Sequence, residues 1–157
     1  MTYLFFLFMS VIGVLWLSCY PAVAADNCPV VPKADISALF QQWNQSLQTG
    51  RPAEVANHYA DDAILVPTIS NGVRHNPGEI EDYFQKFLAF HPDGRLEEEN
   101  IQIYCDIAVN SGIYTFTLIK KGLPAEMRAR FTFVYHKVGD RWLIVDHHSS
   151  AMPENSP

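Results

Sequence analysis

The sequence has 157 residues, of which 48% are hydrophobic and 18% are charged, and its net charge is −6 when the histidines are neutral. This length and composition predict one globular domain with a hydrophobic core. The negative charge argues against binding to nucleic acid or to an anionic membrane, because phosphate groups would repel the protein.

The first segment of the chain is typical of a secretory signal peptide. Residues 2–25 contain no Asp, Glu, Lys or Arg, and an almost unbroken apolar run at 4–17 is followed by Pro21 and small residues at 22–25. The run is shorter than the about 20 residues that a membrane-spanning helix needs, and small residues precede signal cleavage sites. We therefore expect residues 1–25 to be removed and the mature protein to be periplasmic or secreted, with no membrane attachment.

Two alternatives to a cleaved signal peptide stay open. An uncleaved membrane anchor is one, because residues 1–3 carry no Lys or Arg. Lipidation at Cys19 is the other, although the leucine expected three residues before a lipidated cysteine is missing.

Removal of the signal peptide leaves two cysteines, Cys28 and Cys105. An even pair of cysteines in an oxidising compartment predicts a disulfide. This bond would tie an N-terminal lead, residues 26–33, to the folded domain.

The next part of the chain predicts helices. Apolar residues from Ile36 to Leu47 have the spacing of one helix face, and Asp35 is the expected N-cap. A short second helix is expected from Pro52 through Tyr59, with its end at residues 61–62. The third helix is expected to have Asn76 as N-cap, Pro77 at its first position and a stop at residues 91–92.

The remaining segments predict strands, because their apolar residues alternate with a period of two. A short strand is expected at 64–66, and turns are expected at 70–72 and 93–94. Further turns at 110–112, 121–124 and 138–140 would separate the strands 96–109, 113–119, 127–137 and 142–148. Helices followed by antiparallel strands predict an α+β fold with the helices on one face of a curled sheet.

The end of the chain carries a family resemblance. The stretch 130–137, Arg-Phe-Thr-Phe-Val-Tyr-His-Lys, together with 139–153, resembles the last hairpin of the association (hub) domain of calcium/calmodulin-dependent protein kinase II. Residues 65–71, followed by Arg74, are similar to those of bacterial secreted members of that family. The order of elements agrees over residues 34–153, which we take as the domain, and residues 154–157 form a C-terminal tail.

The resemblance implies a cone-shaped nuclear transport factor 2-like (SnoaL-like) fold, in which a curled antiparallel sheet packs on three N-terminal helices around a pocket. It also implies pairing of protomers, sheet to sheet, as homodimers or higher oligomers. It does not imply kinase activity or calmodulin binding, because the chain has no Gly-rich phosphate loop, no His-Arg-Asp or Asp-Phe-Gly motif and no basic amphipathic helix. In the kinase domains the last-strand histidine is followed by an arginine that serves the pocket, whereas Ser149 follows His148 here.

The last strand supplies the candidate catalytic residues Asp146, His147 and His148. Strict alternation would place Leu143, Val145, His147 and Ser149 on one face of this strand. Trp142, Ile144, Asp146 and His148 would lie on the opposite face. Asp146 and His148 could then form an acid–base pair, while His147 would face the pocket. The alternative for each histidine is a structural role in the core or an interface. The spacing of the His, Cys, Asp and Glu residues predicts no metal site, and no cofactor is expected.

The candidate ligand-binding residues are Tyr59, Arg74, Tyr83, Arg130 and His147. The guanidinium of Arg130 or Arg74 could hold a small carboxylate, with His147 or Tyr59 completing an otherwise apolar pocket. The alternatives are a salt bridge for Arg130, plain exposure for Arg74 and core packing for Tyr59 and Tyr83.

These patterns favour an exported, homo-oligomeric and non-catalytic protein with a small-molecule pocket. One alternative is an isomerase, dehydratase or cyclase that uses a His or Asp in the pocket. Another is a secreted protein-interaction module, which would expose an apolar patch.

Overall fold

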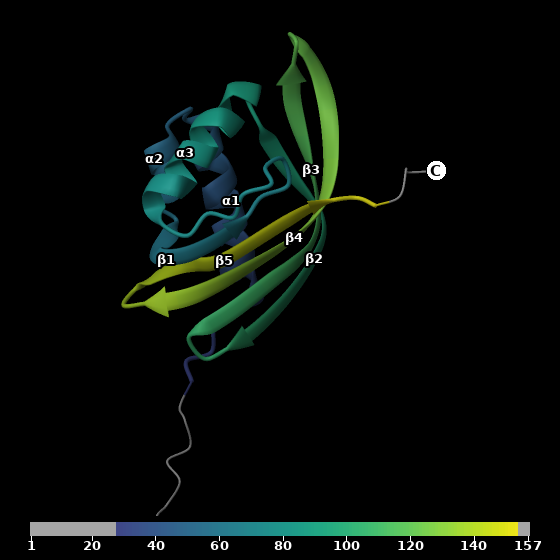
Figure 1. Cartoon of the computed structure of the whole chain (residues 1–157). Coiled ribbons are helices and arrows are strands. Elements are labelled where there is room, and N and C mark those ends of the chain that lie inside the picture. Colours follow the sequence, from purple (N-terminus) through teal and green to yellow (C-terminus); the bar gives the residue numbers. More distant parts are fainter. Residues whose placement is uncertain (1–27, 154–157) are drawn as a thin grey trace, which may run out of the picture.

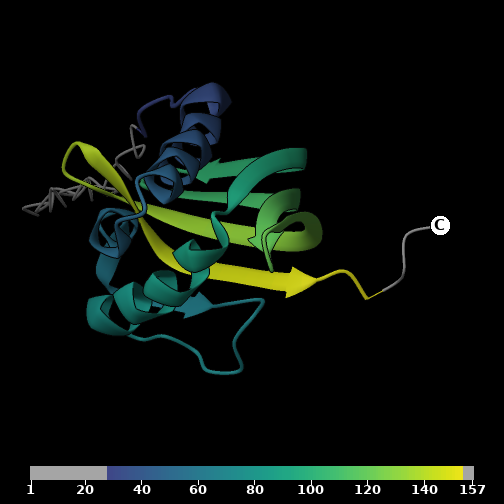
Figure 2. The same ribbon diagram turned by 90° about the horizontal axis from the view of Figure 1, so that it is seen from above.

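A curled five-stranded sheet carries the helices on its inner face (Figures 1 and 2). The structure is a computed structural model and describes residues 28–153, so the expected signal peptide and the C-terminal tail lie outside the described residues. The elements in chain order are α1 (Lys33–Gln48), α2 (Pro52–Ala56), β1 (Tyr59–Val66), α3 (Pro77–Phe87), the 3-10 helix η1 (Leu88–Phe90), β2 (Asp93–Tyr104), β3 (Ile107–Lys120), β4 (Leu123–Val138) and β5 (Arg141–Ala151). None of the helices within this range is long and apolar enough to cross a membrane.

The sheet has the strand order β1-β5-β4-β3-β2. Antiparallel pairing joins β2 to β3, β3 to β4 and β4 to β5, as the sequence predicts, whereas β1 joins β5 in parallel at the edge. The β3–β4 hairpin extends past its neighbours and projects from the sheet (Figure 1). The α+β fold expected from the order of elements is therefore confirmed.

The first helix begins earlier than the sequence predicts. Pro32, in an extended conformation, is the N-cap, and Asp35 lies within the first turn, where its backbone N–H donates to the carbonyl oxygen of Pro32 at 3.0 Å. A carboxylate in the first turn is favourable because it faces the positive end of the helix dipole. The buried face of α1 matches the predicted periodicity and consists of Ile36, Phe40, Trp43 and Leu47.

The predicted second helix is too long. The structure ends α2 at Ala56, and Tyr59 is the first residue of β1 rather than part of the helix. Pairing with β5 decides this, since Tyr59 lies opposite Ile144 and the Ile144 N–H donates to the His58 carbonyl at 2.8 Å. Long-range strand pairing here overrides a local helical pattern.

The third helix has the predicted cap. The Asn76 side chain accepts a hydrogen bond from the Glu79 N–H at 3.0 Å, and the Glu79 carboxylate accepts one from the His75 N–H at 2.8 Å. Pro77 occupies the start of the helix, and the helical segment ends at His91, which has a φ of 48°. Both ends of this element are therefore encoded locally.

The turn expected at 110–112 is wrong. These residues lie inside β3, and the chain turns instead at residues 105–106. The turn expected at 93–94 is also wrong, because Asp93 and Gly94 are the first residues of β2. Asn110 is fully buried on the inner face and donates to the Glu99 carboxylate at 2.7 Å. Asn110 and Gly112 are residue types that are common in turns. In the structure Asn110 forms a buried hydrogen bond, and Gly112 allows a close contact between two strands.

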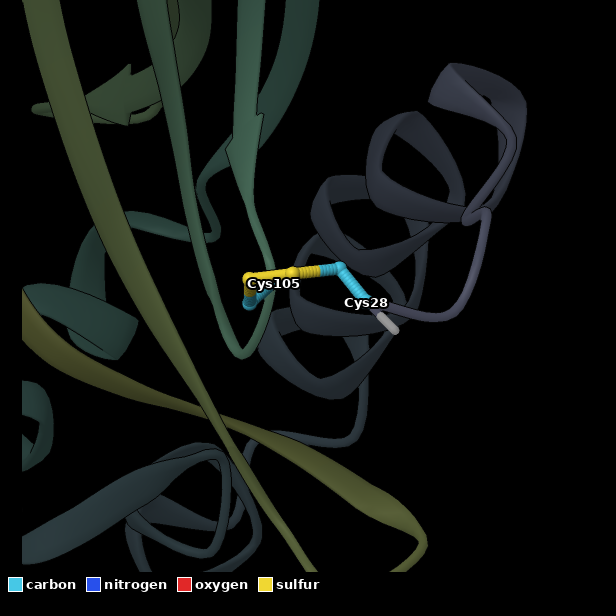
Figure 3. The surroundings of a disulfide bond; sticks show 2 residues. All are labelled: Cys28 and Cys105. Carbon is cyan, nitrogen blue, oxygen red and sulfur yellow. A yellow bond between two sulfur atoms is a disulfide. The ribbon is translucent and has the colours of Figure 1, made fainter. Parts of the chain in front are cut away.

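A disulfide joins Cys28 in the lead to Cys105 in the turn between β2 and β3 (Figure 3). The two Cα atoms are 4.8 Å apart, although the residues are separated by 77 positions in the chain. This bond fits the pairing expected from the sequence.

Candidate functional site

An irregularity in β5 determines which of its side chains face the interior. The register between β4 and β5 shifts between Val134 and Tyr135, so that Val145 is an extra residue in β5. Ile144 and His147 are therefore both buried on the inner face, which strict alternation forbids. The predicted division of β5 into two faces is wrong before this bulge and holds after it, because one inserted residue reverses the alternation.

His147 lies in an aromatic enclosure and is only 3% exposed. Its ring stacks on Phe133 with a centroid distance of 4.0 Å, and the ring of Trp43 meets it edge to face at 5.5 Å. The Tyr59 hydroxyl is 2.8 Å from Nδ1 of the imidazole, whereas Nε2 has no hydrogen-bond partner among the described residues. Nε1 of Trp43 likewise has no partner among the described residues, so the site contains two buried nitrogen atoms that the protein itself does not satisfy.

Burial keeps both members of the Tyr59–His147 pair uncharged at neutral pH. Desolvation, with a smaller contribution from His148, lowers the pKa of His147 to about 3. Desolvation also raises the pKa of the Tyr59 hydroxyl well above its usual value. The pair is therefore a neutral phenol and a neutral imidazole.

Three hydroxyl groups meet beside His147. Ser149, two residues further along β5, accepts a hydrogen bond from the Tyr114 hydroxyl and is also hydrogen-bonded to the Thr68 hydroxyl. Thr68 lies in the connection that follows β1, so these bonds hold that connection against the sheet. No local pattern in the sequence marks Thr68, Tyr114 or Ser149 as site residues, because only the tertiary structure brings them together.

His147 and Ser149 line a narrow cavity between α3, β1 and the inner face of the sheet. Its volume is about 20 Å³, which is room for about one water molecule. The rest of the lining is aromatic and aliphatic apart from hydroxyl groups, and every lining side chain is uncharged at neutral pH. The cavity can therefore accept a small polar group on an apolar body, provided that its wall moves.

Besides His147, three predicted ligand residues lie at or near this cavity. Tyr83 of α3 lines it, and the Arg74 guanidinium lies over the Tyr83 ring at 5.9 Å from the centroid. Arg74 also donates to the Ser70 hydroxyl at 2.8 Å and to the Gly72 carbonyl, and these bonds fix the guanidinium outside the lining. Tyr59 lies behind the imidazole and reaches the cavity only through His147.

Arg130 does not belong to the cavity. Its neighbours Ala129 and Phe131 are buried on the inner face of β4, so Arg130 is exposed on the outer face and donates to the Ala151 carbonyl at 3.4 Å. The expectation that Arg130 and His147 share a pocket is wrong, because the sheet separates them.

The outer face also holds Asp146 and His148. Asp146 lies opposite Val134 in β4, and desolvation raises the pKa of its carboxyl, although the charge of His148 acts in the opposite direction. These two residues share a face as expected, but that face is not the one with the cavity. Within residues 28–153, no group of three or more His, Cys, Asp or Glu side chains is arranged to hold a metal ion.

Residues 32–153 match the family model described as calcium/calmodulin dependent protein kinase II association domain. A solved structure from Xanthomonas campestris, assigned to the same kind of association domain, is 45% identical, with a TM-score of 0.78 over 80% of this chain and 91% of that chain. No curated protein matches the chain.

More distant solved structures show the fold alone. A nuclear transport factor 2-like superfamily protein from Salmonella enterica is 18% identical, with a TM-score of 0.67 over 79% of this chain and 93% of that chain. A candidate dehydratase of the same family from Streptomyces avermitilis is 14% identical, with a TM-score of 0.69 over 78% of this chain and 100% of that chain.

Proposed function

The chain belongs to the calcium/calmodulin-dependent protein kinase II association domain family, and from this premise we propose that it is an exported, self-associating protein that binds a small molecule beside His147 without catalysis. The observation that carries the binding function is the unpartnered Nε2 of His147, beside the unpartnered Nε1 of Trp43, in a largely apolar cavity. Buried polar groups without a partner are rare in proteins and call for an explanation. A bound ligand would supply the missing partner.

Self-association is supported by the family and by the outer face of the sheet. Association domains are oligomerising modules. The outer face carries aliphatic side chains that are only half-buried in the single chain: Ile107, Val109, Ile113 and Val134. Pairing two such faces would remove this apolar surface from water, which favours association.

Export is supported by the N-terminal sequence and by the disulfide. The apolar run at 4–17 and the small residues at 22–25 have the pattern of a signal peptide. The Cys28–Cys105 bond would persist in an oxidising compartment, such as the periplasm or the extracellular space.

Sedimentation of the mature chain tests self-association. We expect a dimer or larger species at micromolar concentration, and Val134→Arg should produce monomers because it brings like charges into the middle of the paired faces. The matched control is Leu123→Arg at the exposed tip of the β3–β4 hairpin, which should leave the oligomer intact. A monomeric wild-type protein would contradict the proposal.

A proton-transfer enzyme is the second candidate, and the contact between Tyr59 and His147 is the observation that favours it. A phenol and an imidazole in contact can move a proton to or from a bound molecule. Two features weigh against this role: the low pKa of His147, which makes it a weak base, and the lack of a carboxylate in the lining. An enzyme of this kind would exchange the α-hydrogens of a small ketone with D₂O, and the His147→Phe variant would not.

A further inference from the structure

We infer that the cavity beside His147 selects an uncharged molecule with an apolar body and one acceptor oxygen, such as a small ketone, and that it rejects the carboxylate of the same shape. This inference rests on the proposed binding function and specifies its ligand. It follows from the direction of the free hydrogen bond and from the absence of charge in the lining of the cavity.

The free polar atom of His147 is a donor. A neutral imidazole has one nitrogen that donates and one that accepts. A phenol is the more acidic partner and an imidazole nitrogen the more basic one, so the stronger arrangement has the Tyr59 hydroxyl donating to Nδ1 across the 2.8 Å contact. The proton of the imidazole is then on Nε2, and a ligand must offer an acceptor oxygen to satisfy it.

The hydroxyl groups beside His147 are already occupied. The Ser149 hydroxyl accepts from Tyr114 and is bonded to Thr68, so these three hydroxyls satisfy one another. The buried polar atoms of the lining that have no partner within the described chain are therefore both N–H donors, Nε2 of His147 and Nε1 of Trp43, and they lie among aromatic and aliphatic groups. This pattern suits a molecule with a single carbonyl rather than a polyol or a sugar.

A carboxylate would enter the cavity without a counter-ion. The Arg130 guanidinium is on the opposite face of the sheet, and Arg74 lies outside the lining, bonded to Ser70 and Gly72 and stacked over Tyr83. His147 cannot supply the charge either, because its burial disfavours protonation. An ionised group buried without a partner loses far more hydration than an uncharged carbonyl loses.

The present volume of about 20 Å³ limits the ligand to a small one and requires part of the wall to move. Met127 of β4 can do this with little disturbance of the sheet, because it is half-buried and has a flexible side chain. The large aromatic residues of the lining would keep their places.

The test compares 2-pentanone with butyrate. The two molecules have the same shape, but butyrate has a charged oxygen where 2-pentanone has a methyl group. The intact, disulfide-bonded mature protein is titrated with each probe at pH 7, and binding is followed by NMR. We expect 2-pentanone to bind at least about tenfold more tightly than butyrate. The His147→Phe variant, which keeps a ring on Phe133, should weaken 2-pentanone binding by about tenfold, the scale of one hydrogen bond.

Two further variants make the result specific. His147→Gln retains a donor and should keep the preference for the ketone, and it replaces His147→Phe if that variant does not fold. Arg130→Ala should leave the affinity for both probes unchanged, because this residue lies across the sheet from the cavity.

The failures are distinguishable. If butyrate binds more tightly than 2-pentanone and Arg74→Ala abolishes its binding, the inference is overturned while the binding function stands. If neither probe binds and the Nε2–H of His147 contacts only water, both the inference and the binding function are overturned.

Discussion

At the scale of the residue, the fold holds His147 in its neutral form, whereas a free histidine side chain is mostly protonated at mildly acidic pH. His147 lies between Phe133 and Trp43, and desolvation lowers its pKa from 6.5 to about 3. Between these two pH values the unfolded chain binds a proton at this residue and the folded protein does not. Acidification should therefore favour the unfolded state.

We predict that the free energy of unfolding falls as the pH is lowered from 6.5 toward 3, with a contribution from His147 on the order of 1 kcal/mol per pH unit. Denaturant unfolding at several pH values measures it. The stability conferred by the neutral imidazole is fully present above pH 6.5 and is lost as the pH falls below it.

The His147→Phe variant is the control for this pH dependence, because its side chain does not titrate. Its stability should depend less steeply on pH than that of the wild type. Burial also lowers the pKa of His58, so part of the slope should remain in the variant. Identical slopes for the two proteins would show that His147 is not the buried neutral group described here.

At the scale of the element, β3 depends on a glycine where the local sequence suggests a turn. Gly112 lies opposite Glu99 of β2, next to the irregularity between Leu96 and Glu98. A Cβ atom at this position would lie 1.9 Å from the Glu98 carbonyl oxygen, and the neighbouring atom is backbone rather than a flexible side chain. The close approach of the two strands therefore requires a residue without a side chain.

Gly112→Ala is accordingly expected to lower the free energy of unfolding by about 1 to 3 kcal/mol, the usual cost of forcing extra atoms into a packed site. Thermal or denaturant unfolding measures the change. Ser111→Ala, one residue earlier and on the outer face, is the matched control and should cost less than about 1 kcal/mol. Equal effects of the two substitutions would mean that β2 and β3 are not in contact at Gly112.

At the scale of the whole molecule, the disulfide links two parts of the chain that are otherwise far apart in sequence. Cys28 precedes the first helix, and Cys105 lies in the turn at the end of the edge strand β2 (Figure 3). The bond closes a loop that spans 77 positions and restricts the unfolded chain over more than half of the described domain.

The double variant Cys28→Ser with Cys105→Ser should lose on the order of 4 kcal/mol of stability, because the unfolded chain gains the freedom that the bond removes. Denaturant unfolding under oxidising conditions provides the measurement. A reducing agent should lower the stability of the wild type by a similar amount and should not affect the variant. Two free thiols in protein purified from the exported fraction would contradict both the bond and the prediction.

Local sequence determined much of this molecule. The spacing of apolar residues from Ile36 to Leu47 predicted the buried face of α1, and Asn76 and Pro77 predicted the start of α3. The order of helices and strands predicted the α+β class, and the stretch 130–153 indicated the family that the matches confirm. These features depend on residues within a few positions of one another, so sequence patterns report them directly.

Tertiary structure alone decided which residues form the site. The bulge at Val145 set the faces of Ile144 and His147, strand pairing moved Tyr59 out of a helix and into contact with His147, and the alternation in β4 placed Arg130 on the far face. The turn at 105–106 and the buried Asn110 likewise followed from pairing between β2 and β3. Strand register is fixed by contacts between distant parts of the chain, and a shift of one residue reverses every side chain that follows, so local patterns could not locate the cavity.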